Sequence, residues 1–239
     1  MTTLVVGATG ATGRLLVTQL LERGRSVRAI VRAADRLPTD VRSNERLTAV
    51  EANLLDLDDA ELARHVSGCD AVASCLGHNL TLKGIYGHPR RLVTDATRRL
   101  CAAIRANGTA APTKFVLMNT AGNQNRDLEE SISFGQKCVV GLIRALVPPH
   151  PDNEQAADYL RTQVGQRDAA IEWVAVRPDT LTDEEQVSEY SAHPSPTRSA
   201  IFNPGKTSRI DVADFMARLV TDAALWDEWK GRMPVLYSA

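Results

Sequence analysis

Residues 4–21 read LVVGATGATGRLLVTQLL, and this stretch decides the fold. A short apolar run is followed by three glycines, Gly7, Gly10 and Gly13, spaced three residues apart. The residues that follow, 14–21, are apolar at helical spacing, which predicts a helix that ends near Gly24. At the start of such a helix, unpaired N–H groups and the helix dipole attract an anion. The order strand, glycine turn, helix therefore predicts a turn that binds the diphosphate of a dinucleotide.

The rest of the chain repeats the alternation of short apolar runs and helical stretches. Further strands are expected at 27–31, 47–50, 71–75, 115–118 and 171–176, and helices near 58–66, 90–107 and 152–164. Short strands separated by helices favour a parallel sheet that is covered on both faces. The sequence predicts a doubly wound α/β (Rossmann) fold. No linker rich in Gly, Ser or Pro and no internal repeat divides the sequence, so we expect residues 1–239 to form a single nucleotide-binding domain.

Two segments exceed the minimal fold. Residues 123–151 predict a helical insertion after the fifth strand, with a helix over 134–146 that Pro148 and Pro149 would terminate. One face of that helix carries Val139, Leu142, Ile143 and Leu146. We expect this face to pack on the core, with a substrate lid or a subunit contact as alternatives. Residues 179–209 are polar and predict a loop before a helix over 212–220, within a substrate-side portion spanning 179–239.

Composition excludes several classes of protein. The 239 residues include 28 Lys and Arg against 29 Asp and Glu, and 44% are hydrophobic, as in a globular protein with a sizeable core. A net charge of −1 argues against the broad basic surface of a nucleic-acid-binding protein. The sequence shows neither a secretory signal nor a long apolar segment, so we expect a cytoplasmic protein without a membrane span. The spacing of the four cysteines and five histidines predicts reduced, unreactive thiols and no metal site.

Charge at the end of the second strand bears on the choice of dinucleotide. An NAD site usually has an acidic residue about 20 residues beyond the glycines. Here Arg32 follows the strand, Asp35 comes three residues later, and Arg14 and Arg36 lie nearby in sequence. A guanidinium pairs with a 2′-phosphate, whereas a carboxylate repels it. The sequence therefore favours NADP(H), and the alternative for Arg32 and Arg36 is a solvated surface charge.

Polar or small residues follow the other strands too. Asn53 and Leu54 follow the third strand, 76–78 follow the fourth, and 119–122 follow the fifth. Because the carboxyl ends of parallel strands share one edge, these residues are expected to line the ligand site, although each segment also fits ordinary turn chemistry. His78 is interpreted as a solvent-facing loop histidine, with a proton donor as the alternative.

These motifs resemble the atypical short-chain dehydrogenases/reductases, in particular the NAD(P)H-binding, NmrA-like and flavin-reductase-like branch. The resemblance rests on Gly-Ala-Thr-Gly-x-x-Gly-Arg, Val31-Arg32, Val176-Arg177-Pro178 and residues 207–215, and it covers about 3–178 and 207–220. It implies NADP(H) held by Gly7, Thr9, Gly10, Ala11, Thr12 and Gly13, with Arg14 and Arg32 near the 2′-phosphate, Asn53 and Leu54 at the adenine, Leu76 and Gly77 beside the ribose, and Thr120 near the nicotinamide.

The chain departs from typical members at the catalytic pair. Those members have a Ser after the fifth strand and Tyr-x-x-x-Lys on the next helix. Here the residues four positions after Tyr86, Tyr159 and Tyr190 are Arg, Gln and Pro, and Thr120 stands in place of the Ser. We therefore expect an NADPH-dependent oxidoreductase that reduces a small conjugated substrate, with Thr120 as its candidate catalytic residue.

Two other functions stay open at this point. One is a non-catalytic NADP(H) redox sensor that acts through a protein partner and docks by the 134–146 helix; the other is an isomerase or epimerase. The sequence also leaves open whether the chain forms a homo-oligomer.

Overall fold

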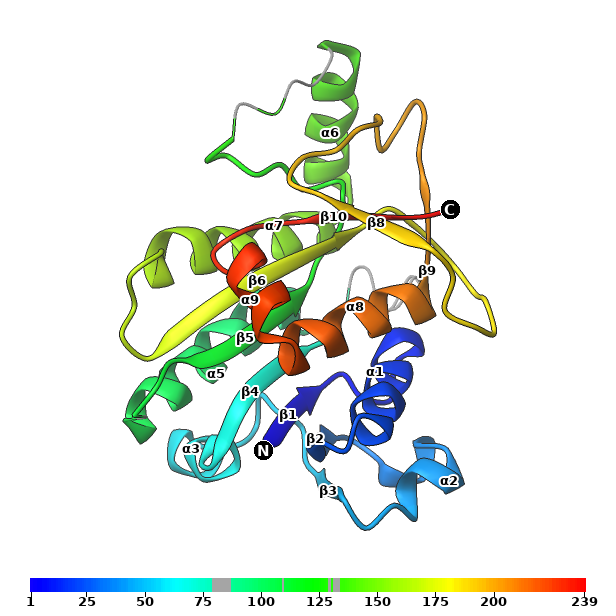
Figure 1. Ribbon diagram of the computed structural model, residues 1–239. Coiled ribbons are helices and arrows are strands. Elements are labelled where there is room, and N and C mark those ends of the chain that lie inside the picture. The colour runs from blue at the N-terminus through cyan, green and yellow to red at the C-terminus, as the bar shows by residue number, and fades with distance from the viewer. Residues whose placement is uncertain (79–86, 109, 129, 131–133) are drawn as a thin grey trace.

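A sheet of eight strands in the order β3-β2-β1-β4-β5-β6-β10-β8 runs through the molecule (Figure 1). The computed structural model describes residues 1–78, 87–108, 110–128, 130 and 134–239. The strands are β1 (Thr2–Val6), β2 (Ser26–Val31), β3 (Leu47–Glu51), β4 (Cys69–Ser74), β5 (Thr113–Met118), β6 (Ile171–Pro178), β7 (Thr180–Thr182), β8 (Tyr190–His193), β9 (Lys206–Ser208) and β10 (Val235–Ser238). The helices are α1 (Ala11–Glu22), α2 (Thr39–Arg42), α3 (Asp59–Val66), α5 (Leu92–Asn107), α6 (Phe134–Leu146), α7 (Pro149–Tyr159), α8 (Arg209–Thr221) and α9 (Ala223–Trp229).

Strands β1 to β6 are all parallel, so their carboxyl ends lie at one edge of the sheet. In the register, Val6 of β1 pairs with Ile30 of β2 and Ser74 of β4. The strand order reverses between β1 and β4, and this switch point is where open α/β sheets bind their ligands. The predicted doubly wound fold is confirmed.

Both faces of the sheet are buried, as the alternation along β1 shows. Val5 packs in one cluster with α1, α8 and α9, whereas Leu4 and Val6 pack in the other with α3, α5 and α7. Trp226 and Trp229 of α9 are buried in the first cluster. The glycine turn thus emerges from a strand that is buried on both faces.

The prediction of a loop over residues 179–209 is wrong in part. This segment contains the short strands β7, β8 and β9, where β7 pairs with β9 and β8 pairs with β10. Strands of three or four residues carry too little alternation to be recognised from their pattern. The strand β10 was missed for the same reason.

Helix α6 lies after the fifth strand, where a helical insertion was predicted, and it stands out from the sheet and its covering helices (Figure 1). The expectation that its apolar face packs on the core is wrong for Leu142 and Leu146, which are 60% and 55% exposed. Val140 is buried instead, and the side chain of Ile143 lies outside the described residues. Helix α6 ends before the two prolines, and Pro149 begins α7.

The described cysteines agree with the expectation of unreactive thiols. Cys69, Cys75 and Cys101 are free, and burial raises the pKa of the Cys75 and Cys101 thiols to about 12. The side chain of Cys138 is outside the described residues. Of the helices in the described ranges, none is both long and apolar enough to cross a bilayer.

Candidate nucleotide-binding site

The backbone itself requires glycine at the turn between β1 and α1. Gly7 has φ +74°, and a Cβ there would lie 2.5 Å from the carbonyl carbon and oxygen of Cys75, just after β4. A Cβ on Gly13 would lie 2.1 Å from the carbonyl oxygen of Gly7, and one on Gly10 would lie 3.2 Å from the same oxygen. These approaches let α1 start directly against β1 at the switch point.

The N-terminus of α1 is open to an anion. Its N-cap is Gly10, no side chain caps it, and its first turn contains no acidic residue. Side chains cap the first amides of other helices: Asp58 caps α3, Ser208 caps α8 and Asp222 caps α9. The uncapped amides and the missing Cβ atoms leave α1 suited to a diphosphate.

The other predicted residues of the turn surround this N-terminus. Thr9 is half-buried, Ala11 is exposed and Thr12 is buried. Neither threonine caps α1, because the N-cap forms no side-chain hydrogen bond. Their hydroxyl contacts with a nucleotide stay predictions.

The arginines predicted near the 2′-phosphate are exposed. Arg14 lies in the first turn of α1, and Arg32 and Arg36 follow β2. Within the described ranges, none of the three forms a side-chain hydrogen bond or an ion pair. A carboxylate does lie at this loop: Glu51 Oε1 accepts a hydrogen bond from the Ala34 N–H at 2.7 Å. The three guanidinium groups are therefore available to a ligand anion.

The segments after β3 and β4 differ in exposure. Asn53 is exposed, and its Nδ2 donates to Asp56 Oδ2 at 2.8 Å, whereas Leu54 is buried. Leu76 is half-buried against the core. Gly77 is exposed, and a Cβ there would meet no atom of the described residues within 4 Å. Packing against the described part of the chain therefore does not require glycine at position 77.

A network of side-chain and backbone hydrogen bonds fixes the turn after β5. The Oδ1 atom of Asn119 accepts from the Thr120 N–H at 2.8 Å and from Asn123 Nδ2, and its Nδ2 donates to the Asn153 carbonyl at 3.0 Å. Thr120 is half-buried, and its hydroxyl oxygen accepts from the Gly122 N–H at 3.3 Å. The turn thus presents the Thr120 hydroxyl from a fixed backbone.

Sequence reasoning missed a charged group beside this turn. His150, in the first turn of α7, packs over Gly122, and its Nε2 atom lies 3.5 Å from Oε1 of Glu154. Arg144 of α6 donates to both carboxylate oxygens of Glu154 at 2.6–3.0 Å. Burial would raise the pKa of Glu154, but the neighbouring His150 imidazole and the hydrogen bonds from Arg144 outweigh it and lower the pKa to about 2. The sequence signal was His-x-x-x-Glu, with the spacing of the absent Tyr-x-x-x-Lys.

The expectation that His78 faces solvent is wrong. Its side chain is 4% exposed, and Nε2 lies 2.8 Å from Oδ2 of the buried Asp152. The Asp152 carboxylate also accepts from the N–H groups of Val93 and Thr94, at the start of α5. Although burial would raise the pKa of Asp152, these hydrogen bonds hold it below its usual value. This carboxylate caps α5, so the N-terminus of α5, unlike that of α1, is closed to a ligand anion.

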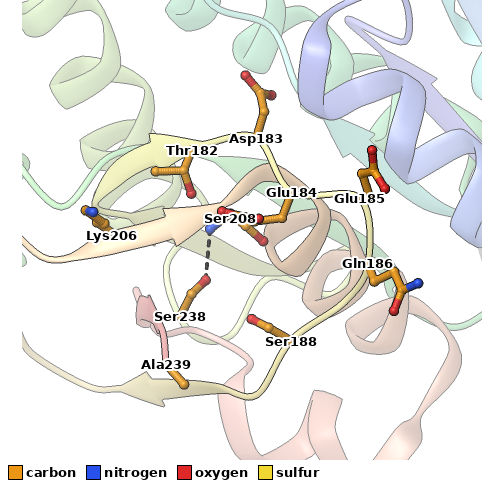
Figure 2. Close-up of a pocket in the computed structure, with 10 residues that line it drawn as sticks. All are labelled: Thr182, Asp183, Glu184, Glu185, Gln186, Ser188, Lys206, Ser208, Ser238 and Ala239. Atoms are coloured by element: carbon orange, nitrogen blue, oxygen red, sulfur yellow. Dashed lines mark hydrogen bonds between the residues drawn. The ribbon is translucent and has the colours of Figure 1, made fainter.

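A separate cavity of about 730 Å³ lies between β7, β9 and the C-terminus (Figure 2). Three of its lining residues, Asp183, Glu184 and Glu185, are acidic, and Lys206 is its one basic lining residue. Like charges would repel the phosphates of a dinucleotide there. The acidic lining makes this cavity less suited to a nucleotide than the glycine turn is.

A parallel sheet whose switch point carries a glycine turn and an uncapped helix defines a dinucleotide-binding α/β protein. Consistent with this class, the chain matches the model of the NAD(P)H-binding family over residues 7–223 and belongs to that family. The match confirms the resemblance that the sequence motifs indicated.

Solved structures share the fold at low identity. The oxidoreductase ylbE of Lactococcus lactis is 19% identical with a TM-score of 0.71, over 100% of this chain and 91% of that one. A short-chain dehydrogenase/reductase of Veillonella parvula in complex with NADP is 13% identical with a TM-score of 0.69, over 99% and 94%. A candidate NADH-flavin reductase of Streptococcus pneumoniae is 18% identical with a TM-score of 0.64, over 100% of both chains. At these identities the likeness shows the fold alone.

Proposed function

We propose that this chain is an NADP(H)-dependent oxidoreductase that reduces a small conjugated substrate. One observation carries the proposal: the turn at 7–13 excludes a Cβ at Gly7 and Gly13 and ends on the uncapped, carboxylate-free start of α1. A diphosphate would fit there because backbone N–H groups would face it and no described side chain caps the helix. Thr9, Ala11 and Thr12 complete this part of the proposed site.

The preference for NADP(H) rests on the exposed arginines. Arg32 follows the strand next to β1, and Arg14 lies in the first turn of α1. Neither forms an ion pair within the described ranges, so pairing with a 2′-phosphate would not require breaking an existing ion pair. Asn53 and Leu54 are proposed to meet the adenine, and Leu76 and Gly77 the ribose.

The substrate is proposed to bind at the end of β5. When bound, the reduced nicotinamide supplies a hydride. Thr120 and Asn119 would orient the acceptor by hydrogen bonding, since the turn that carries them is fixed by its own hydrogen bonds. We propose a conjugated acceptor because the chain lacks a Tyr–Lys pair. With such an acceptor, positioning the hydride is expected to account for much of the rate. The proton that completes the reduction comes from another group or from water.

Stopped-flow oxidation of NADPH with quinones, flavins and enones tests the proposal. We expect at least one of these classes to be reduced, Thr120→Val to lower kcat about tenfold, and Thr120→Ser to retain most activity, because positioning depends on the hydroxyl. No NADPH oxidation above background with any class would contradict the proposed activity.

A second candidate function is a nucleotide-dependent sensor that binds a protein partner. The exposed Leu142 and Leu146 on α6 are the observation that favours it. Such a sensor would bind its partner to different extents with NADP+ and NADPH. If recovery of the partner were the same with either nucleotide and with none, this candidate would be removed.

A further inference from the structure

The side chains of His150 and Thr120 converge on Gly122. The position that a Cβ on Gly122 would take lies 3.5 Å from Cε1 of His150, 3.9 Å from its Nδ1 and 3.6 Å from the Thr120 hydroxyl oxygen. The imidazole edge with Nδ1 therefore faces the turn that follows β5. His150 is 12% exposed, so its ring is mostly withdrawn from solvent.

The opposite edge of the imidazole faces a fixed carboxylate. Nε2 lies 3.5 Å from Glu154 Oε1, at the limit of hydrogen-bond distance, and has no well-aligned hydrogen-bond acceptor among the described residues. Glu154 forms a bidentate ion pair with Arg144, and its side chain is 12% exposed. The carboxylate at that edge favours the tautomer whose proton is on Nε2.

We propose that His150, positioned by Glu154 and Arg144, is the group that exchanges a proton with the substrate at the carboxyl end of β5. This inference rests on the proposed oxidoreductase function and adds its proton donor. His150 and Glu154 are four residues apart on α7, so they lie on the same side of the helix. His150 is the proposed general acid, whereas Glu154 and Arg144 are positioning residues.

The proton balance of the step is simple. In the proposed reduction of a conjugated carbonyl, the bound reduced nicotinamide would supply a hydride with its two electrons, and protonated His150 would supply one proton. A C–H bond forms at the acceptor carbon, the N–H bond at Nδ1 breaks, and its proton goes to the acceptor oxygen. His150 is left neutral with a proton on Nε2, and water returns the proton at Nδ1. The nicotinamide is oxidised and the acceptor is reduced.

The partners of His150 and His78 favour His150 in this role. Glu154 of α7 lies beside the His150 ring, and Arg144 of α6 pairs with Glu154. Asp152 lies two positions on along α7, about half a helical turn away, and its carboxylate holds His78 and the start of α5. The His78 ring is therefore held by Asp152, whereas the His150 ring lies beside Gly122 with the Thr120 hydroxyl.

Nuclear magnetic resonance of the nucleotide-free protein tests the positioning without any turnover. In ¹H–¹⁵N spectra of the imidazole side chains, we expect neutral His150 to carry its proton on Nε2, with a proton resonance that Glu154→Gln shifts upfield. A proton on Nδ1, or a spectrum that Glu154→Gln leaves unchanged, would overturn the role of Glu154. The Gln variant keeps the shape of the side chain and so separates loss of charge from loss of packing.

Steady-state kinetics with NADPH and a 1,4-quinone tests the proton transfer. We expect His150→Ala to lower kcat about 100-fold, to bind NADPH within about twofold of the wild type, and to regain activity when imidazole is added. The matched control, His65→Gln on α3 at the opposite edge of the sheet, is expected to keep its kcat within twofold.

The outcomes separate the two proposals. If the folded wild type neither binds NADPH nor reduces an acceptor, the proposed function fails. If the wild type is active and His150→Ala keeps more than a tenth of its kcat, or loses activity that imidazole does not restore, only the role of His150 fails.

Discussion

Arg177 of β6 and Glu130, from the segment after β5, form an ion pair that is almost fully buried. The two side chains are 0% and 3% exposed, with N–O distances of 2.7 and 3.1 Å. The same guanidinium donates to the carbonyl oxygens of Met233 and Asn123. Because one side chain joins β6, the approach to β10 and the turn after β5, it anchors the segment that presents Thr120.

Breaking this ion pair should destabilise the fold strongly. We expect Arg177→Met to lower the free energy of unfolding by about 3–5 kcal/mol, because it leaves the Glu130 carboxylate buried and unpaired. Urea denaturation measures the change. The double variant Arg177→Met, Glu130→Leu should recover most of the loss. Arg91→Met, at an exposed pair with Asp95, should cost less than about 1 kcal/mol. Equal losses for Arg177→Met and Arg91→Met would show that burial adds nothing to the pair.

Alanine substitutions at the glycines of the site should differ in effect, depending on which atoms the added Cβ would contact. Gly13→Ala places a methyl group against the Gly7 carbonyl, so we expect a loss of about 1–3 kcal/mol in unfolding free energy together with loss of nucleotide binding. The methyl group of Gly77→Ala would meet nothing among the described residues, so we expect thermal stability to stay unchanged while nucleotide binding weakens. Calorimetry and thermal denaturation of both variants check this. Unchanged nucleotide affinity in Gly77→Ala would place the ribose elsewhere.

Reversing the charge at Arg32 should change nucleotide selectivity. We expect Arg32→Glu to weaken NADPH binding by about 2–3 kcal/mol, because an attraction to the 2′-phosphate becomes a repulsion, with little effect on NADH. Titration calorimetry with both nucleotides measures the difference. Arg167→Glu makes the same charge change in the exposed loop before β6, at the other edge of the sheet, and should affect neither nucleotide. Equal losses of both nucleotides in Arg32→Glu would exclude this role.

Stability at acid pH should depend on Glu154. Its folded-state pKa is about 2, below the ordinary 4.5, so its stabilisation is present above pH 4.5 and is lost as the pH falls towards 2. We expect the contribution of Glu154 to the free energy of unfolding to fall by about 2 kcal/mol between pH 6 and pH 3. Urea denaturation of the wild type and Glu154→Gln at both pH values tests the sign. From pH 6 to pH 3, the free energy of unfolding should fall less in Glu154→Gln than in the wild type, by that same amount. An identical fall in both proteins would contradict the lowered pKa of Glu154.

The elements that decide the fold were predictable because each carries a local signal. The glycine turn, the buried strands and the helices after them have patterns set by period and by backbone geometry. Their places in the structure agree with the sequence. The short strands β7 to β10 were not predicted, because pairing with distant partners and not local alternation determines them.

The site was predictable only where it depends on backbone. Gly7 and Gly13 were found because a turn of this shape excludes a Cβ. The burial of His78 and the approach of His150 to Gly122 depend on how α7 packs against α5 and the turn after β5, which are far from α7 in sequence. Gly122 leaves room for the His150 ring, but a single glycine in the sequence does not predict that contact.

Titration calorimetry of the folded wild-type protein with NADPH and with NADH tests the central claim most directly. We predict one binding site per chain, with NADPH bound more tightly than NADH because Arg14 and Arg32 can pair with the 2′-phosphate that only NADPH carries. Absence of binding heat for both nucleotides at several temperatures, in protein shown to be folded, would contradict the assignment of the glycine turn.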